Sequence, residues 1–303
     1  NNISVKDQAC IKLNDEKLNK LGMKNAVISF VDSDKNSPED IEKFAKDPLT
    51  PDATLKQYVE NGKALSLVAE NPNASVETIR ELFKKAPGLD VFITKNPSAP
   101  PDMLEKIYNG GKADNFIKRH LSENKNTPPH ILKELANDPN LQVKREVAGN
   151  VSTTSDVLKE LYEFKSPVFG NKNDPFIELA LAENTSTPVD ILNNQSKTHN
   201  DLTMLITLAR NNSVPQGTIR EMHNKVKELA KTISHITISD FNEALLKNSN
   251  TPQDLIPILK KELSEENKKF PLTEIATEPN IPVGPPMQAG VKYTIGTFTV
   301  EKK

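Results

Sequence analysis

Two aspartates and an asparagine near the start of the chain have the spacing of metal ligands. Asp32, Asp34 and Asn36 offer side-chain oxygens at alternate positions, as a calcium-binding loop does, and the apolar run before Asp32 also fits an Asp-x-Asp motif of phosphoryl transfer. An EF-hand loop needs glycine at its sixth position and glutamate at its twelfth, where this chain has Ser37 and Lys43. Phosphoryl transfer would need an α/β domain, for which the helical pattern of the chain leaves no room. We therefore expect a polar loop ahead of a helix cap, with no metal bound there.

The other residue types with catalytic or ligand chemistry show no working arrangement. The single cysteine, Cys10, excludes an intrachain disulfide and a cysteine-rich zinc or iron–sulfur site. The histidines lack the paired spacing of a metal site, and the sequence contains neither a GxSxG motif nor a glycine-rich phosphate loop. We predict a protein that is not an enzyme and needs no cofactor. The histidines are His120, His130, His199, His223 and His235.

The composition argues against two further functional classes. With 39 lysines and arginines against 41 aspartates and glutamates, the formal net charge is -2, so the basic excess typical of general nucleic-acid and polybasic membrane binders is missing. The absence of tryptophan and an aromatic content of 5% disfavour base-stacking grooves. No stretch approaches the roughly 20 apolar residues of a membrane span, and the start lacks a signal-peptide pattern. We expect no membrane association and a bacterial cytoplasmic or virion location.

An internal repeat supplies the elements that must position any site. An asparagine, or an aspartate in the first copy, recurs at intervals of 24 to 37 residues, and we call it the anchor. Apolar residues stand eight positions after each anchor and three before it. From the second anchor on, a further apolar residue stands seven positions before the anchor. The positions seven and three before the anchor are four residues apart, so they lie on one face of a helix. The anchors are Asp47, Asn71, Asn96, Asn124, Asn150, Asn184, Asn211 and Asn248.

Threonine and proline mark the start of a helix after many anchors. In Thr187-Pro188 and Thr251-Pro252 an acidic residue follows three positions after the threonine. This pattern predicts threonine as the N-cap, proline at the first helical position and an acid near the positive helix end. The box at residues 37–40 predicts the same start, with serine as the cap. Most of the 22 prolines therefore punctuate a regular array.

Each repeat is predicted to be a capped helix, a turn and a shorter helix that ends at the next anchor. Neither helix buries its apolar stripe alone, so the repeats should stack around a continuous core. We interpret the anchor asparagines as loop-capping residues in left-handed or backbone-bonded geometry, with a ligand-binding asparagine ladder as the alternative. The two longest intervals hold insertions, around residues 164–175 and 225–239, that should form loops or lengthen a helix.

Residues 124–150 carry the elements of a known repeat. The stretch opens with Asn-Lys-Asn-Thr-Pro-Pro-His-Ile-Leu-Lys-Glu-Leu-Ala and closes with Val-Lys-Arg-Glu-Val-Ala-Gly-Asn. It resembles the leucine-rich repeat variant family of bacteria, and the resemblance extends over roughly residues 47–260. That family implies a right-handed, HEAT-like α-solenoid of α/3-10 units that serves as a binding scaffold. Lysine follows Asn124 and valine follows Asn150, and the later repeats are longer, so the second element there could be a full α-helix. No metal function carries over, because the cysteines that accompany such repeats in one family member are missing.

The predicted architecture is an all-α, right-handed α-solenoid of about eight repeats, α/α or α/3-10, over residues 47–268. Residues 1–46 form a nonrepeating N-terminal cap segment, and residues 269–303 form a proline-rich linker and a β-like arm. The arm alternates like two short strands, which indicates either a local hairpin or an arm that adds a strand to a partner. Tyr293 and Phe298 in this arm are candidate partner-binding residues.

Two basic pairs are the remaining candidate contact residues. Lys118-Arg119 and Lys144-Arg145 hold equivalent positions in adjacent repeats, and stacking would place the pairs about 10 Å apart. They form either a site for an acidic segment or phosphate, or a solvated helix edge. We predict a non-enzymatic protein–protein interaction scaffold whose partner is a protein or a neighbouring subunit. One alternative is a structural subunit of a large assembly such as a bacteriophage particle, docking through terminal arms; the other is a HEAT-like nucleic-acid binder.

Overall fold

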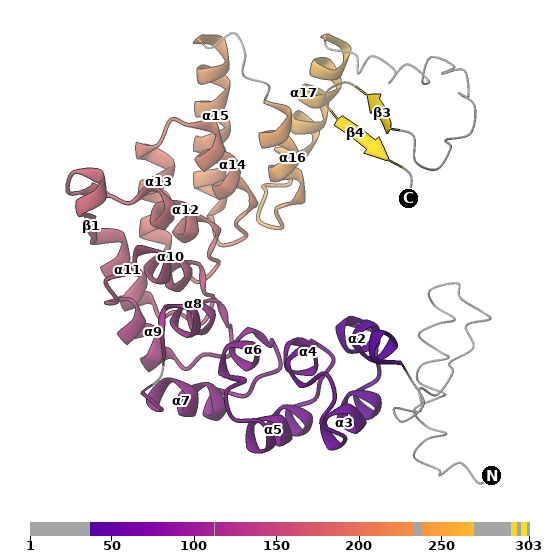
Figure 1. The fold of residues 1–303 in the computed structure, drawn as a ribbon. Coiled ribbons are helices and arrows are strands. Elements are labelled where there is room, and N and C mark those ends of the chain that lie inside the picture. The colour runs from indigo at the N-terminus through magenta and orange to yellow at the C-terminus, as the bar shows by residue number, and fades with distance from the viewer. Residues whose placement is uncertain (1–36, 112, 233–237, 270–291, 296–297, 302–303) are drawn as a thin grey trace. The chain divides into compact units, whose positions relative to one another are not determined.

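The computed structural model describes residues 37–111, 113–232, 238–269, 292–295 and 298–301. The aspartate loop at residues 32–36, Cys10 and the proline-rich linker lie outside these residues. The described part contains 16 α-helices, labelled α2 to α17, which confirms the predicted all-α repeat fold (Figure 1). The chain divides into two compact units, residues 1–132 and 133–303, and each is described by itself.

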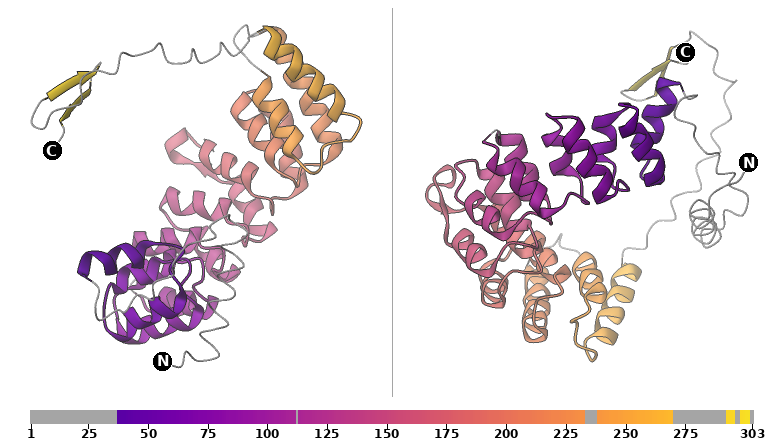
Figure 2. Two further views of the ribbon diagram at one scale, coloured as in Figure 1. Left: turned by 90° about the vertical axis from the view of Figure 1, so that its right-hand side faces the viewer. Right: turned by 90° about the horizontal axis from the view of Figure 1, so that it is seen from below.

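The helices of the first unit form two layers. In what we call the even layer, α2, α4, α6 and α8 pack on one another in order, while α3 and α5 pack side by side in the odd layer (Figures 1 and 2). Each repeat gives one α-helix to each layer, so the repeats are α/α. The helices are α2 (Pro38–Lys46), α3 (Asp52–Glu60), α4 (Leu65–Glu70), α5 (Val76–Lys85), α6 (Asp90–Lys95), α7 (Pro101–Asn109) and α8 (Asn115–Glu123), followed by α9 (Pro129–Leu135) at the boundary.

The second unit repeats this arrangement. Helices α10, α12, α14 and α16 form an even layer of this unit, α13 packs on α15, and α17 packs on α16. The first insertion forms a small hairpin, and the second lies at the end of α15, a helix of 17 residues. The elements are α10 (Leu141–Gly149), α11 (Ser155–Glu163), β1 (Lys165–Ser166), η1 (Pro167–Phe169), β2 (Lys172–Asn173), α12 (Pro175–Glu183), α13 (Val189–Thr198), α14 (Leu202–Arg210), α15 (Gln216–Thr232), α16 (Ser239–Lys247) and α17 (Ile256–Lys269).

Both ends refine the predicted boundaries. Helix α2, placed within the N-terminal cap segment by the sequence, packs on α4 and so is the first member of the even layer. At the other end, β3 (Lys292–Ile295) and β4 (Phe298–Glu301) pair in antiparallel register, with Tyr293 opposite Val300 and Phe298 opposite Ile295. The two predicted strands of the arm are therefore confirmed as a hairpin.

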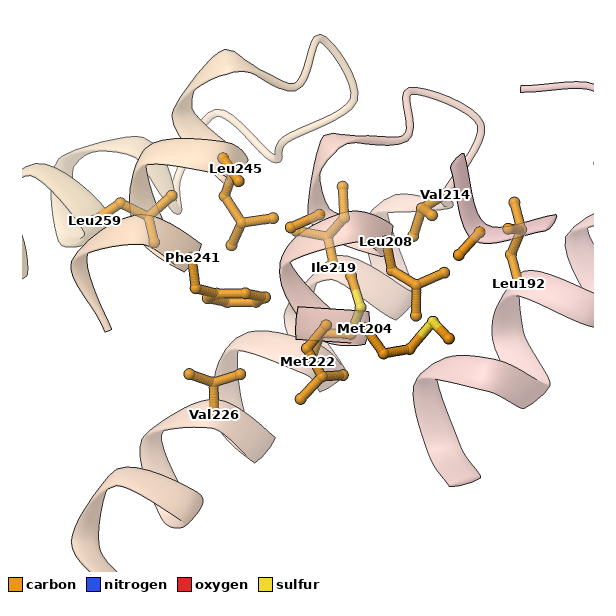
Figure 3. Packing of buried hydrophobic residues seen from close by; sticks show 14 of the residues in the cluster. Leu192, Met204, Leu208, Val214, Ile219, Met222, Val226, Phe241, Leu245 and Leu259 are labelled. Atoms are coloured by element: carbon orange, nitrogen blue, oxygen red, sulfur yellow. The ribbon is translucent and has the colours of Figure 1, made fainter. Parts of the chain in front are cut away.

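The core of the second unit follows the predicted apolar positions. Met204 and Leu208 of α14, and Phe241 and Leu245 of α16, stand seven and three residues before their anchors and are buried (Figure 3). Burying one such side chain stabilises the fold by about 2 kcal/mol. Figure 3 shows them facing residues contributed by the odd layer and its loops, namely Leu192, Val214, Ile219, Met222, Val226 and Leu259.

Two parts of the apolar pattern differ from the prediction. In the last repeat Leu255 and Leu259 are buried and Ile256 is only half-buried. Helix α17 begins at Ile256, eight residues after its anchor, whereas the other helices of the odd layer begin five residues after theirs, and Pro257 lies in its first turn. In the first unit, α4 and α6 have only six residues each and begin after the position seven before the anchor. Ala64 and Leu89 therefore precede their helices and are half-buried.

The threonines do not cap the helices that follow them. Thr187 Oγ1 instead donates to the main-chain oxygen of Leu181, at the end of the preceding helix, at 2.7 Å, and Pro188 is the N-cap of α13. The hydroxyl thus donates to an unpaired carbonyl at the end of α12 and does not accept from the unpaired N–H groups at the start of α13. Thr50, Thr127, Thr153 and Thr251 donate in the same way to Phe44, Leu121, Val147 and Leu245 at 2.5 to 2.6 Å. The serine of the first box does cap its helix, since Ser37 accepts from the N–H of Asp40 at 3.1 Å.

Candidate functional site

The anchor asparagines join each repeat to the one before it. Asn96 Nδ2 donates to the main-chain oxygens of Ala69 at 2.7 Å and Asn71 at 2.9 Å, while Asn96 Oδ1 accepts from the N–H of Ser98 at 2.8 Å. The same three bonds recur at Asn71 and Asn124 in the first unit and at Asn184, Asn211 and Asn248 in the second.

This asparagine ladder is a structural device in which the side chains bond to the backbone. The anchor asparagines are buried, and Asn96 is 0% exposed. Their backbone is extended, as at Asn96 with φ -72° and ψ 124°, so of the two geometries expected from the sequence the asparagines adopt the backbone-bonded one and not the left-handed one. An extended residue lets the amide reach two carbonyls of the preceding repeat while the next turn closes on its own side-chain oxygen. The amides are thereby engaged within the protein.

A charge ladder runs parallel to it along the odd layer. The residue nine after one anchor pairs with the residue six after the next, as where Arg80 makes two hydrogen bonds of 2.8 and 2.6 Å with Asp102. That hydrogen bond lowers the pKa of Asp102. In the next step the acidic residue stands nine after the anchor instead of six, and Glu105 lies 3.1 Å from His130. Within the second unit the ladder contains Lys133–Asp156, Lys159–Asp190 and Arg220–Asp254. The interleaved charges thus connect neighbouring repeats.

The two predicted basic pairs fall in different units. Lys118 and Arg119 lie on α8, where Arg119 Nε bonds to Glu123 at 2.9 Å. Lys144 on α10 is only 8% exposed, and its Nζ donates to the main-chain oxygen of Ala136 at 2.5 Å. Burial lowers the pKa of Lys144. Its ammonium lies 4.8 Å from the centre of the Phe164 ring, so this lysine fastens the start of the insertion to the end of α9.

Arg145 holds the other end of the insertion. Its Nη2 lies 2.9 Å from Oδ2 of Asp174, whose side chain is 0% exposed. Asp174 is also the N-cap of α12 and accepts from the N–H groups of Phe176 and Ile177. The guanidinium of Arg145 stacks 4.4 Å from the centre of the Phe176 ring. The sequence did not predict this contact. The sequence signal for this contact is weak: Arg145 stands five residues before one anchor, and Asp174 stands ten residues before the next.

The insertion between these two fastenings is a tight hairpin. Strands β1 and β2 pair in antiparallel register, Lys165 opposite Asn173 and Ser166 opposite Lys172, and η1 joins them. The turn closes through Gly170 and Asn171 at φ 65° and 58°, in the left-handed region that glycine and asparagine tolerate best.

The hairpin presents apolar side chains to solvent. Val168 is 71% exposed and Phe176 is 55% exposed, and the Phe169 and Phe176 ring centres are 6.4 Å apart. We call Val168, Phe169, Phe176 and Arg145 the insertion patch. The Phe169 and Phe176 rings lie together, and grouped exposed apolar side chains are typical of interaction sites.

A polar pocket of about 450 Å³ adjoins the same hairpin. Asn194 Nδ2 donates to the Tyr162 hydroxyl at 2.6 Å, and Asn173 Nδ2 donates to Glu178 Oε1 at 2.8 Å. We call this the insertion pocket. Its lining is Tyr162, Glu163, Lys165, Asn173, Glu178, Asn194, Thr198 and His199, from α11, β1, β2, α12, α13 and the C-cap of α13. A second pocket of about 430 Å³ lies in the first unit, where His120 contacts Glu123 within the lining and Lys95 pairs with Glu70 outside it.

A buried polar network fixes the last helix of the array. Glu262 of α17 lies 2.8 Å from Nε2 of His223, accepts from Lys227 at 2.7 Å, and accepts from Asn242 Nδ2 at 3.1 Å. Burial would raise the pKa of Glu262, but the hydrogen bonds from His223 and Lys227 outweigh it and the pKa lies below its usual range. One carboxylate therefore connects α15, α16 and α17.

Together these features define the class of the protein: an α/α helical-repeat protein with an insertion hairpin. In the described part of the chain, no group of three or more histidine, cysteine, aspartate or glutamate side chains is placed to hold a metal ion. None of the helices described has the length and apolar character needed to cross a membrane. No protein-family model, curated protein sequence or solved structure matches the chain. The resemblance to the leucine-rich repeat variant family therefore stays an expectation from the sequence.

Proposed function

We propose that this chain is a non-enzymatic protein-interaction scaffold of the helical-repeat type, and that a protein partner contacts the insertion patch. The observation that carries the proposal is the exposure of Val168 and Phe176, at 71% and 55%. Aromatic side chains and arginine, here Phe176 and Arg145, are enriched at the centres of protein interfaces. Arg145 is fixed beneath the Phe176 ring by Asp174, so the patch is preorganised for binding.

The alternative of a nucleic-acid binder has less support. Lys144 and Arg145, two of the four basic residues it would use, are engaged with Ala136 and Asp174. Phosphate binding requires exposed lysine and arginine side chains, and Lys144 is buried. A structural subunit of a large assembly is the second candidate. The β3–β4 hairpin favours it, because each strand of a two-stranded sheet has an unpaired edge available for strand addition.

The proposal is tested with a paired variant and a matched control. The partner is first captured from the native source with the tagged full chain, identified by mass spectrometry and purified. Val168→Ser/Phe176→Ser should weaken its binding at least tenfold, which corresponds to about 1.4 kcal/mol. The control is Phe116→Ser, because Phe116 is the second residue of α8 as Phe176 is of α12, and it is 67% exposed. Unchanged binding in the paired variant, or an equal loss in the control, would overturn the proposal.

A further inference from the structure

We propose that the insertion patch binds a partner segment in which apolar side chains are flanked by aspartates or glutamates. The inference rests on the proposed function, because it names the kind of segment that the same patch accepts. Two features of the hairpin lead to it: the exposed apolar side chains of the patch and the positive charge beside them.

The insertion carries only positive charge. Residues 164–173 include Lys165 and Lys172 and contain no aspartate or glutamate. The next residue, Asp174, has a side chain that is 0% exposed and paired with Arg145, so it presents no negative charge to solvent. An exposed surface of this charge favours partners that carry carboxylates.

The two lysines belong to opposite faces of the hairpin. Lys165 stands opposite Asn173, and both line the insertion pocket, where the Lys165 ammonium donates to Asn173 Oδ1. Successive residues of a strand alternate between faces, so Lys172, the neighbour of Asn173, belongs to the other face. Asp174 is also extended, lies two residues after Lys172 and bonds to Arg145. Lys172 is therefore on the same side of the hairpin as Arg145 of the insertion patch.

The donors on this side are available to a partner. Lys172 is exposed, and its ammonium has no hydrogen-bond or salt-bridge partner among the described residues. Arg145 contacts Asp174 through Nε at 3.3 Å and Nη2 at 2.9 Å, whereas its Nη1 has no hydrogen-bond partner in the described part of the chain. Glu146, next to Arg145 on α10, already accepts from Gln142. A carboxylate from a partner would satisfy the remaining donors.

The carboxylates of this region gather on the other face. Glu163 and Glu178 line the insertion pocket together with Lys165 and Asn173. An acidic segment bound at the patch would avoid these glutamates, whereas a basic segment would meet Lys172. The distribution of charge over the two faces thus selects an acidic segment for the patch side.

Apolar contacts supply the rest of the interaction. Val168 and Phe176 are 71% and 55% exposed, and the Arg145 guanidinium stacks on the Phe176 ring at 4.4 Å. A leucine or phenylalanine of the partner would cover these side chains and exclude water from the donors beside them. Removing water lowers the local dielectric constant, which strengthens an ion pair with Lys172.

An anionic membrane is the less favoured occupant of the patch. Attachment to such a membrane needs several unpaired basic residues or a second anchoring signal. Lys144 is buried, and the charge of Arg145 is balanced by Asp174. Lys172 is then the charge that the patch side offers, which is enough to select a partner segment but weak as a membrane anchor.

The test titrates three blocked hexapeptides into the ¹⁵N-labelled full chain. All three have a central Leu-Phe, and their flanks are aspartate and glutamate, asparagine and glutamine, or lysine. The backbone amide signals of Val168 and Phe176 should shift, and the acidic peptide should have a Kd about fivefold below that of the neutral one at about 0.05 M salt. The basic peptide should bind most weakly. The differences should shrink at about 0.5 M salt, because ions screen exposed charges.

Charge reversal at Lys172 is the most specific check. Lys172→Glu should invert the order, so that the basic peptide binds more tightly than the acidic one. Lys260→Glu is the matched control, because Lys260 is an exposed lysine of α17 with no salt-bridge partner among the described residues, and it should leave the order unchanged. Val168→Ser/Phe176→Ser should weaken binding of the acidic and neutral peptides alike, which would locate them on the patch.

Equal Kd values for the acidic and neutral peptides, no shifts at Val168 and Phe176, or an unchanged order in Lys172→Glu would each overturn the inference. So would co-sedimentation with phosphatidylserine vesicles that is lost in Val168→Ser/Phe176→Ser, since the patch would then contact lipid. Failure of the proposed function is distinct: there the acidic peptide still binds the patch, while Val168→Ser/Phe176→Ser leaves binding of the captured partner intact.

Discussion

The side-chain amide of Asn96 donates to the main-chain oxygen of Asn71 at 2.9 Å, so two residues that hold the same place in consecutive repeats are bonded to each other. The same amide also reaches Ala69, at the end of the even-layer helix that precedes Asn71. Hydrogen bonds, as well as apolar packing, therefore set the spacing between neighbouring repeats. It also makes the asparagine amide hard to replace.

Asn96→Asp should destabilise the protein by about 3 kcal/mol or more. The change keeps the size of the side chain but removes a donor, which leaves two buried carbonyls without their bond and places a carboxylate beside them. Urea unfolding followed by circular dichroism measures the effect. Asn115→Asp, an exposed substitution in the first turn of α8, is the control and should stay within about 0.5 kcal/mol. A loss of similar size in both variants would contradict the structural role of Asn96.

Thr127→Val should cost about 1 to 2 kcal/mol, because the main-chain oxygen of Leu121 loses its 2.6 Å bond from the threonine hydroxyl. Thr127→Ser keeps the hydroxyl and should recover part of that loss. The chain offers a natural control at Val214, which occupies the same place three residues after an anchor. Val214→Thr can donate to the carbonyl at the end of α14 and should change stability by less than about 1 kcal/mol. Equal losses in the valine and serine variants would rule out the hydroxyl as the cause.

Arg145→Met should loosen the insertion hairpin and cost about 3 kcal/mol. The methionine keeps the apolar stem but leaves the buried Asp174 carboxylate without its cation. Hydrogen exchange should speed up for the amides of β1, β2 and the first turn of α12. Arg119→Met is the matched control, because Arg119 stands at the same position on α8 and pairs with the exposed Glu123, so about 0.5 kcal/mol or less is expected. Exchange that is unchanged across the hairpin would contradict the fastening role.

The stability that Glu262 gives to α17 should disappear in acid. Its pKa is lowered in the folded protein, so the carboxylate stabilises the fold above the unfolded value of about 4.3, and this contribution is lost as the pH falls through the folded pKa. Thermal unfolding from pH 7 to pH 3 should show a gap between wild type and Glu262→Gln that is constant near neutrality. The gap should narrow toward pH 3. A gap that persists at pH 3 would exclude the ionised carboxylate as its source.

Deleting residues 278–303 tests the assembly candidate. The helical repeats contain the described core, so the truncated chain should keep its helical circular dichroism spectrum and its unfolding midpoint. Size-exclusion chromatography with the captured partner then reports complex formation. Loss of the complex with an intact spectrum would support docking through the arm. Retention of the complex would assign binding to the repeats, and unfolding of the truncated chain would make the arm an intramolecular element.

Much of the fold could be predicted because the repeat depends on residues that are close together in the sequence. Met204 and Leu208, four residues apart, define one face of a helix without any knowledge of the partner helix. The anchors Asn184 and Asn211 likewise mark the ends of helices by their recurrence in the sequence alone. The role of Thr187 could not be read this way, since its hydroxyl has a carbonyl behind it and N–H groups ahead of it, and only the folded turn decides between them.

The candidate site was less accessible to sequence reasoning. Arg145 and Asp174 are 29 residues apart on either side of an insertion, and their contact depends on where the hairpin returns the chain. Position in the repeat groups Lys144 and Arg145 with Lys118 and Arg119, whereas Lys144 bonds to the main-chain oxygen of Ala136 and Arg145 bonds to Asp174. The expected 10 Å spacing between the two pairs stays a prediction, because they belong to different units.

The reversed step of the charge ladder restricts how this array could grow. Tandem duplication of the repeat that follows Asn96 would bring Glu105 against a second copy of Asp102, and like charges would then face each other. Duplicating the repeat after Asn71 would instead set Arg80 against a copy of Glu77, a favourable pair. The copies are therefore not interchangeable modules, and their order along the chain is itself encoded in the polarity of the surface pairs.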